Sequence, residues 1–319
     1  MLDPYLPRLL FIPLLFTSLA MAAERGPAVP DHPAERIAED VYVIHGPLGV
    51  PSVENQGFIN NPGFVIGRDG VIVIDPGSSV QTGEMVLRQI RKLSDLPVVA
   101  VFNTHIHGDH WLANQAIRDA YPDAKIFGHE EMRRLVEQGE GKAFLATLMR
   151  MTEGAVAGTV EVPPDHSAAQ GDELVLGGVT LRIHYEAKAH SHSDIMIELP
   201  QQKVLFLGDN VMNRRMGRMD HGTFGGNIAA IERALATPAE IFVPGHGKTG
   251  GREVPEIYLG YLTRLKGAVV RHYEEGLSDF EMSPLIIRSL SQFHDWVDFQ
   301  RNVGRHISLA YLEVEAELF

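Results

Sequence analysis

A short segment rich in metal-ligand side chains, Thr104–His110 (THIHGDH), most constrains what this chain can fold into. It follows an apolar run, Pro97–Phe102, that predicts a buried strand, and it precedes an amphipathic stretch, Trp111–Tyr121, that predicts a helix. We therefore expect the segment on a strand-to-helix loop, where a rigid scaffold can aim several side chains at one point. Neutral imidazole and carboxylate groups suit zinc and similar metals, and the density of histidine disfavours a merely solvated loop.

The order of residues within this segment suggests two neighbouring metal positions. His105 and His107 can face one side of an extended segment, whereas Asp109 and His110 turn toward another. The sequence contains no cysteine, so any metal must be held by histidine or carboxylate side chains.

Three further ligand-type residues share one property: each lies where a predicted strand meets a loop. His190 lies before a predicted strand, Asp209 ends one and His246 follows one. If these strands are neighbours, their ends converge on one rim. His192 could replace His190 as a ligand, but the spacing back from the following strand favours His190.

These candidate ligands divide into two sets with one residue between them. The first set is His105, His107 and His190, the second is Asp109, His110 and His246, and Asp209 could bridge the two. Two metals about 3.5–4 Å apart can share a hydroxide and stabilise a developing oxyanion, and a bound metal can lower the pKa of water to about 7. The sequence therefore predicts a site that activates water.

The whole pattern of ligand-type residues resembles the metallo-β-lactamase-fold hydrolases. His-x-His-x-Asp-His, then a lone His, Gly-Asp and Pro-Gly-His-Gly follow one another over residues 36–250. The resemblance implies the α/β (α+β) class: a four-layer αββα sandwich with a dinuclear site at one edge, here with a C-terminal helical extension. It assigns the same two ligand sets and the same bridging Asp209. It also makes Asp75 the buried aspartate that supports the metal loop.

Departures from the lactamase pattern narrow the subgroup. The absence of cysteine excludes the lactamase classes with a Cys ligand, and another lactamase group lacks the bridging carboxylate that Asp209 supplies. Met212 stands where some lactamases have a lysine that holds the substrate carboxylate. The ligand set is more similar to glyoxalase II, lactonases and the sulfur-oxidation or quinoprotein-associated periplasmic hydrolases. Among these, Val41–Ile44, Gly63–Gly67 and Asp75–Gly77 resemble the last group most.

These features predict a dinuclear zinc hydrolase that uses a metal-bound hydroxide to cleave an ester, lactone, thioester or amide. Asp109 would orient the hydroxide. Two Zn²⁺ are expected, although iron or manganese would suit the same ligands. An iron-dependent oxidoreductase similar to persulfide dioxygenases, a β-lactamase and a non-catalytic metal-binding protein remain as alternatives.

The substrate pocket is expected to involve charged residues near the ligands. Arg214, Arg215 and His221 lie in the loop after Asp209, and the remaining candidates are Lys248 and His192. A cationic loop beside the metals would suit a small anionic substrate. The formal net charge of −13 argues against a nucleic-acid partner, which requires a basic surface. The oligomeric state stays open.

The N-terminal residues predict export. Leu9–Ala20 is apolar and Ala20–Ala22 offers a small-x-small cleavage site, so residues 1–23 resemble a signal peptide for the periplasm or secretion. An uncleaved anchor or a disordered tail is the alternative; after cleavage no stable membrane association is expected. Residues 24–35 are expected to be a linker, 36–250 the metal-binding domain, and 251–319 helices packed on that domain.

Overall fold

The computed structural model describes residues 25–318, and the proposed signal segment lies outside the described residues. Two sheets pack face to face within this range. The strands of the first, in spatial order, are β1 (Glu35–Ala38), β2 (Val41–Val43), β3 (Gly63–Ile66), β4 (Val71–Ile74), β5 (Val98–Phe102), β6 (Lys125–Gly128) and β7 (His166–Ser167). The second has the order β12 (Ile241–His246), β11 (Val204–Met212), β10 (Ile195–Leu199), β9 (Val179–Tyr185) and β8 (Glu173–Leu176).

The central core lies between the two sheets because both sheets turn apolar faces inward. Ile72 and Phe102 from the first sheet share one buried cluster with Ile183, Ile197 and Phe206 from the second. Strands β4, β5 and β6 are parallel neighbours, as are β11 and β12. The carboxyl ends of β4, β5 and β6 therefore lie along one edge of the first sheet, and those of β11 and β12 along one edge of the second.

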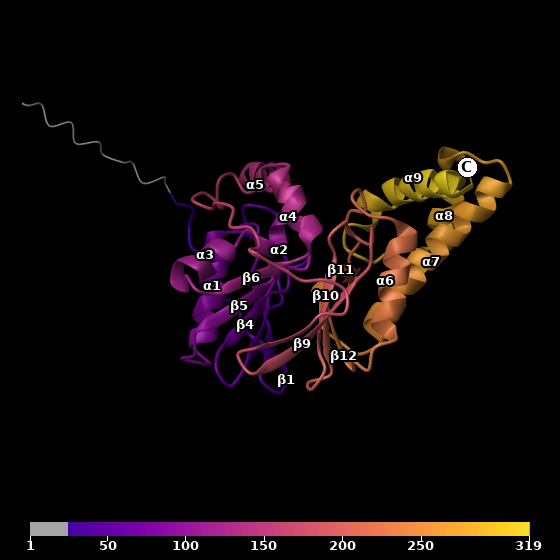
Figure 1. Cartoon of the computed structure of the whole chain (residues 1–319). Helices are drawn as coiled ribbons and strands as arrows, with labels where there is room; N and C mark the ends of the chain where they lie inside the picture. Colours follow the sequence, from indigo (N-terminus) through magenta and orange to yellow (C-terminus); the bar gives the residue numbers. More distant parts are fainter. Residues whose placement is uncertain (1–24, 319) are drawn as a thin grey trace, which may run out of the picture.

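Helices cover the outer face of each sheet (Figure 1). Those before the second sheet are α1 (Val80–Arg91), α2 (Gly108–Trp111), α3 (Asn114–Ala120), α4 (Glu130–Glu137) and α5 (Glu140–Met151). Those within and after it are α6 (Phe224–Leu235), α7 (Glu253–Glu274), α8 (Asp279–Ser289), the short 3₁₀ helix η1 (Ser291–Phe293) and α9 (Phe299–Leu318). Helices α1 and α3 pack on the first sheet, and α6, α7 and α9 lie beside the second. The four-layer αββα class with C-terminal helices is thus confirmed.

Two helices have local features that define their course. Helix α6 begins at Phe224 because the Thr223 hydroxyl accepts from the Gly226 N–H at 3.0 Å, and Asn227 lies inside the helix. Pro284 lies within α8. A capping box at Ser278 and the buried Met282 and Ile286 hold α8 on both sides of the proline. None of the helices within residues 25–318 combines the length and apolarity needed to cross a bilayer.

Candidate metal centre

The ends of β5, β11 and β12 meet at one rim, and close backbone packing shapes it. Gly208 has φ +54°, which favours glycine, and a Cβ there would lie 2.8 Å from the Thr104 side chain. At Gly245 a Cβ would lie 1.9 Å from Asp209 Oδ1. The space that the Asp209 carboxylate occupies therefore exists only because residue 245 has no side chain.

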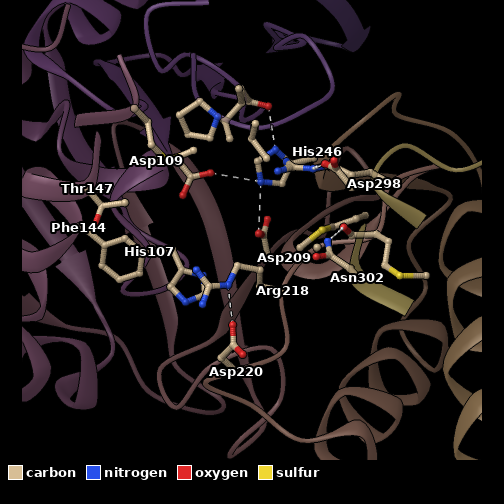
Figure 2. A pocket seen from close by; sticks show the side chains of 18 of the residues that line it. His107, Asp109, Phe144, Thr147, Asp209, Arg218, Asp220, His246, Asp298 and Asn302 are labelled. Carbon is tan, nitrogen blue, oxygen red and sulfur yellow. Dashed lines mark hydrogen bonds and ion pairs between the residues drawn. The ribbon is translucent and has the colours of Figure 1, made fainter. Parts of the chain in front are cut away.

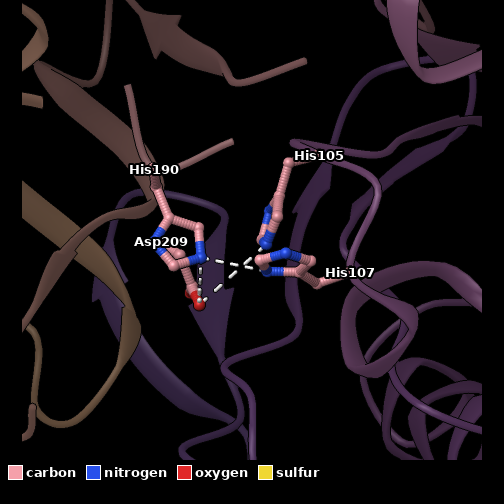
Figure 3. Close-up of side chains that lie close together, drawn as sticks. All are labelled: His105, His107, His190 and Asp209. Atoms are coloured by element: carbon pink, nitrogen blue, oxygen red, sulfur yellow. Dashed lines mark hydrogen bonds and ion pairs between the residues drawn. The ribbon is translucent and has the colours of Figure 1, made fainter. Parts of the chain in front are cut away.

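The first group of ligand-type side chains comprises His105, His107, His190 and Asp209, whose ligand atoms all lie within 4.8 Å of one another. Figure 3 shows the three imidazoles turned toward the Asp209 carboxylate. His190 Nε2 lies 3.0 Å from His107 Nδ1 and 3.6 Å from Asp209 Oδ2. His105 Nε2 lies 3.9 Å from the same oxygen. The atoms surround one point, as ligands of a single ion do.

The second group comprises Asp109, His110 and His246, again with ligand atoms within 4.8 Å of one another. Asp209 also borders this group, because its Oδ1 lies 3.2 Å from His110 Nε2 and its Oδ2 lies 3.3 Å from His246 Nε2. His246 Nε2 lies 3.4 Å from Asp109 Oδ2. The Asp209 carboxylate therefore stands between the two groups.

Hydrogen bonds on the far side of three imidazoles fix which nitrogen faces the centre. The Nδ1 atom of His105 lies 2.9 Å from Thr104 Oγ1, and that of His246 lies 2.8 Å from the Ile59 carbonyl oxygen. His110 Nδ1 lies 2.8 Å from Asp75 Oδ2. A carbonyl or carboxylate oxygen can only accept, so Nδ1 of His246 and of His110 carries a proton, and Nε2 is the nitrogen that faces the centre.

Asp75 holds the metal loop as the resemblance implies. It lies just after β4 at φ +49°, and its carboxylate accepts from the Thr104 N–H at 2.8 Å and the Thr104 hydroxyl at 2.7 Å. Its second oxygen also accepts from His110. One buried carboxylate thus supports residues on both sides of the metal loop and leaves the Thr104 oxygen free to accept from His105.

The protonation states of the three histidines in the first group suit metal binding. Burial lowers the pKa of His105 and His107, and it lowers the pKa of His190 to about 4, so these imidazoles are neutral at pH 7. Burial also opposes charge on His110, but the carboxylates of Asp209 and Asp109 raise its pKa well above its ordinary value. The second group is therefore the one in which negative charge gathers.

Several buried atoms of the cluster lack a partner among the described residues. They are His105 Nε2, His110 Nε2, Asp209 Oδ1 and His190 Nδ1. Buried polar atoms normally have partners, and the first three of these atoms face the centre. The donor set therefore fits metal ions, and within residues 25–318 these two groups are the only ones of their kind.

A cavity of about 360 Å³ opens over the cluster. Figure 2 shows Phe144 and Thr147 of α5 on one side and Asp298 and Asn302 on the other, with His246 among the ligands between them. Val50, Leu148, Met151 and Met216 add apolar wall, while Arg150, Arg215, Arg218 and Arg301 add positive charge.

The structure brings only some of the expected pocket residues to this cavity. Arg215 and His221 line it, and His221 Nδ1 lies 2.9 Å from His107 Nε2. Arg214 and Lys248 do not, because each is exposed and forms an ion pair elsewhere: Arg214 with Asp295 and Lys248 with Glu35, both at 2.9 Å.

His192 also misses the pocket. The chain bends at Ser191–Ser193, where the Ser191 N–H donates to Asp194 at 2.5 Å. The alternation of an extended segment is lost there, so His190 is buried in the cluster and His192 is exposed.

Sequence reasoning missed the cavity residues that come from α5, from α9 and from the position just before α9. Phe144, Asp298, Arg301 and Asn302 line the cavity, and the Ile59 carbonyl orients His246. Nothing local in the sequence marks them, because each depends on how a distant element docks. Only the helical pattern of the C-terminal region offered a signal that something packs there.

The family profile described as the metallo-beta-lactamase superfamily matches residues 56–246. The linear primary-alkylsulfatase of Pseudomonas sp. is 24% identical over 255 residues, which cover 67% of this chain and 47% of that protein. The hydroxyacylglutathione hydrolase of Gloeothece citriformis is 27% identical over 171 residues, which cover 54% of this chain and 56% of that protein. This chain therefore spans about half the length of these curated relatives.

Solved structures show the same fold. A metallo-beta-lactamase from Pontibacter korlensis superposes with a TM-score of 0.59 at 21% identity, covering 72% of this chain and 98% of that one. A stereoselective inverting sec-alkylsulfatase from Pseudomonas sp. superposes with a TM-score of 0.68 at 16% identity, covering 88% of this chain and 50% of that one. The 88% of this chain that superposes on the alkylsulfatase contains more residues than precede the C-terminal helices, so the match includes part of these helices.

Proposed function

Because this chain belongs to the metallo-beta-lactamase superfamily, we propose that it is a dinuclear zinc hydrolase of small esters, lactones, thioesters or amides. The observation that carries the proposal is the place of Asp209. Its two oxygens lie 3.2 Å from His110 Nε2 and 3.3 Å from His246 Nε2, while its Oδ2 also lies 3.6 Å from His190 Nε2 in the other group. A carboxylate so placed suits two ions better than one.

Each set of residues would have a separate role in the reaction. His105, His107 and His190 would hold one ion, and Asp109, His110 and His246 the other, with Asp209 between them. When bound, such ions supply Lewis acidity and lower the pKa of water, so that a nucleophile exists at neutral pH. The Asp109 carboxylate, which borders the cavity, would accept a hydrogen bond from the attacking water and orient it. The apolar wall from α5 would exclude bulk water from the scissile bond.

The test is metal content together with turnover. We expect about two zinc ions per chain and hydrolysis of at least one member of a panel of lactones, thioesters, aryl esters and β-lactams. Asp209→Ala should reduce the metal content toward one ion and the rate by at least about 100-fold. Unchanged stoichiometry and rate in this variant would refute the bridging role.

Sulfate-ester hydrolysis is the second candidate. It is favoured by the alkylsulfatase structure that superposes on 88% of the chain and by the four arginines that line the cavity. The panel therefore includes octyl sulfate and 4-nitrophenyl sulfate, with release of inorganic sulfate as the readout. Sulfate release without ester cleavage would assign this reaction instead.

The remaining alternatives have their own signatures. Iron in the purified protein, with oxygen consumption on persulfides, would assign an oxidoreductase. Two bound metals without turnover on the whole panel would leave a metal-binding protein. We also propose export through residues 1–23, which mass spectrometry of the mature N-terminus would test.

A further inference from the structure

A buried arginine in the cavity wall lacks hydrogen-bond acceptors. The Arg215 side chain is 9% exposed and lines the cavity. Its Nε and Nη1 atoms have no partner among the described residues. The nearest carboxylate, Asp298, lies 4.0 Å from Nε, which is beyond hydrogen-bond distance. A buried guanidinium with unpaired N–H groups is costly, so this site favours a ligand that accepts hydrogen bonds.

The backbone holds Arg215 in place against the C-terminal helices. The Met216 N–H donates to the Val297 carbonyl at 2.9 Å, and the Val297 N–H donates to the Arg214 carbonyl at 3.1 Å. Asn302 of α9 donates to the Met216 carbonyl at 2.7 Å. The guanidinium is therefore part of a fixed wall, whereas Arg214 next to it is exposed and paired with Asp295.

The same wall contains the N-terminus of α9. This helix has 20 residues, and Arg301 and Asn302 in its first turn line the cavity. The first turn of a helix carries partial positive charge and attracts anions. Arg301 adds a full positive charge on the same side. Positive potential from Arg301 and from the start of the helix thus meets the Arg215 guanidinium in one part of the cavity.

We propose that Arg215 and the first turn of α9 form a binding subsite for an oxyanion carried by the substrate. The rest of the cavity presents apolar side chains, among them Val50, Leu148 and Met151. The ligand class that satisfies both surfaces is an amphiphilic anion, with a carboxylate or sulfate at Arg215 and an apolar chain along the wall. The link to turnover rests on the proposed hydrolase function; the binding step does not.

The first experiment is calorimetric titration of the zinc-loaded protein with octanoate and with octane-1-sulfonate, neither of which can be hydrolysed. Arg215→Met should weaken binding about 10- to 100-fold, because the loss of hydrogen bonds to a charged group has an effect of about this size. Arg214→Met is the matched control: it removes the same charge from the adjacent exposed residue, and its Kd should stay within about twofold. Equal Kd values for wild type and Arg215→Met would overturn the subsite.

A second variant shifts the affinity in the opposite direction. Asp298→Asn removes the carboxylate that competes for Arg215, and asparagine tolerates the φ of +62° at this position. We expect anion binding to tighten several-fold. If Asp298→Asn instead weakens binding as Arg215→Met does, Arg215 only organises the wall. Arg215→Lys keeps the charge but loses the planar guanidinium, so it should give an intermediate Kd. This variant keeps the proposal testable if Arg215→Met does not fold.

Turnover then separates the two sources of the oxyanion. A carboxylate remote from the scissile bond predicts that Arg215→Met raises KM for 4-nitrophenyl hydrogen suberate and leaves KM for neutral 4-nitrophenyl octanoate unchanged. A scissile sulfate predicts that the loss falls on octyl sulfate. If no substrate is cleaved, the proposed hydrolase function fails while the titrations still decide the subsite.

Discussion

The ligand rim and the opposite cavity wall are built in different ways. At the rim, the ligands lie at or near strand ends of both sheets, and a short chain of contacts from His105 through Thr104 to Asp75 supports those of the first sheet. In the wall, Arg215 and Asp298 come from segments more than 80 residues apart, which are joined by main-chain hydrogen bonds of Val297 with Met216 and with Arg214. The rim depends on local motifs, whereas the wall depends on docking of the C-terminal helices.

Because of this difference, the proposed reaction and the proposed recognition of the substrate depend on different regions of the molecule. The rim contains the groups that can hold metal and activate water, and it rests on the two sheets. The wall contains the groups that would recognise an anion, and it can change with the helices while the sheets stay the same. Variants can therefore damage one region and spare the other.

The largest effect is expected within the rim. His190→Ala should remove a ligand of the first group and lower the rate by at least about 100-fold, with loss of metal measured by emission spectrometry. His192→Ala is the matched control, because this histidine is two residues away but exposed. Equal losses in both variants would contradict the assignment of His190.

A smaller effect is expected from a variant that weakens the hydrogen bonds supporting the rim. Asp75→Asn keeps the size and the positive φ but removes the charge that accepts from Thr104 and His110. Metal affinity should fall about 10- to 100-fold, because the loss of a group that orients metal ligands typically reduces affinity by this factor. Competition with a chromophoric chelator measures it, and octane-1-sulfonate binding at saturating zinc should be unchanged.

The wall is tested by His306, which is buried between the Tyr261 hydroxyl at 2.7 Å and the Gly217 carbonyl at 2.8 Å. His306→Phe removes the side-chain partner of the Gly217 carbonyl and leaves the Tyr261 hydroxyl only its long contact with Met216 Sδ, at 3.6 Å, so it should cost about 2–4 kcal/mol of stability at pH 7. Anion binding should weaken, but metal content should not change.

The same variant makes a pH prediction. Burial lowers the pKa of His306 to about 4, below the ordinary value of 6.5. The neutral form therefore stabilises the fold above pH 6.5, and this contribution of up to about 3 kcal/mol is lost as the pH falls toward 4. Urea unfolding at several pH values should show the gap between wild type and His306→Phe shrinking in acid; a constant gap would contradict this.

The smallest effect is expected in α8, away from the cavity. Ser278→Ala removes the capping box with Glu281 and should cost about 1 kcal/mol of stability. Neither metal content nor anion binding should change. If Ser278→Ala weakened anion binding, the structure of the cavity wall would depend on the whole helical extension and not only on α9.

The sequence predicted the rim well because its information is local. His105, His107, Asp109 and His110 lie in one motif, and Asp209 could be placed because a strand end is recognisable from apolar residues that give way to a loop. The structure adds the geometry: the groups converge, and Gly245 leaves room for the Asp209 carboxylate.

The wall could not be predicted from the sequence for the opposite reason. Arg214, Arg215 and Lys248 all carry a positive charge. The directions of Arg214 and Lys248 depend on acidic partners far along the chain: Asp295 is 81 residues from Arg214, and Glu35 is 213 residues from Lys248. Nothing near Arg215 in sequence indicates that α9 returns to this loop.

Helix α9 extends from the cavity to the start of α6, where Glu313 accepts from the Phe224 and Gly225 N–H groups. A ligand held between Arg215 and the first turn of α9 is thus in thermodynamic linkage with docking of the entire helix. Occupancy should slow amide hydrogen exchange along α9 as far as Glu313, beyond any residue that the ligand touches. By reciprocity, loosening the far end of this helix should weaken ligand affinity without altering a single contact in the cavity.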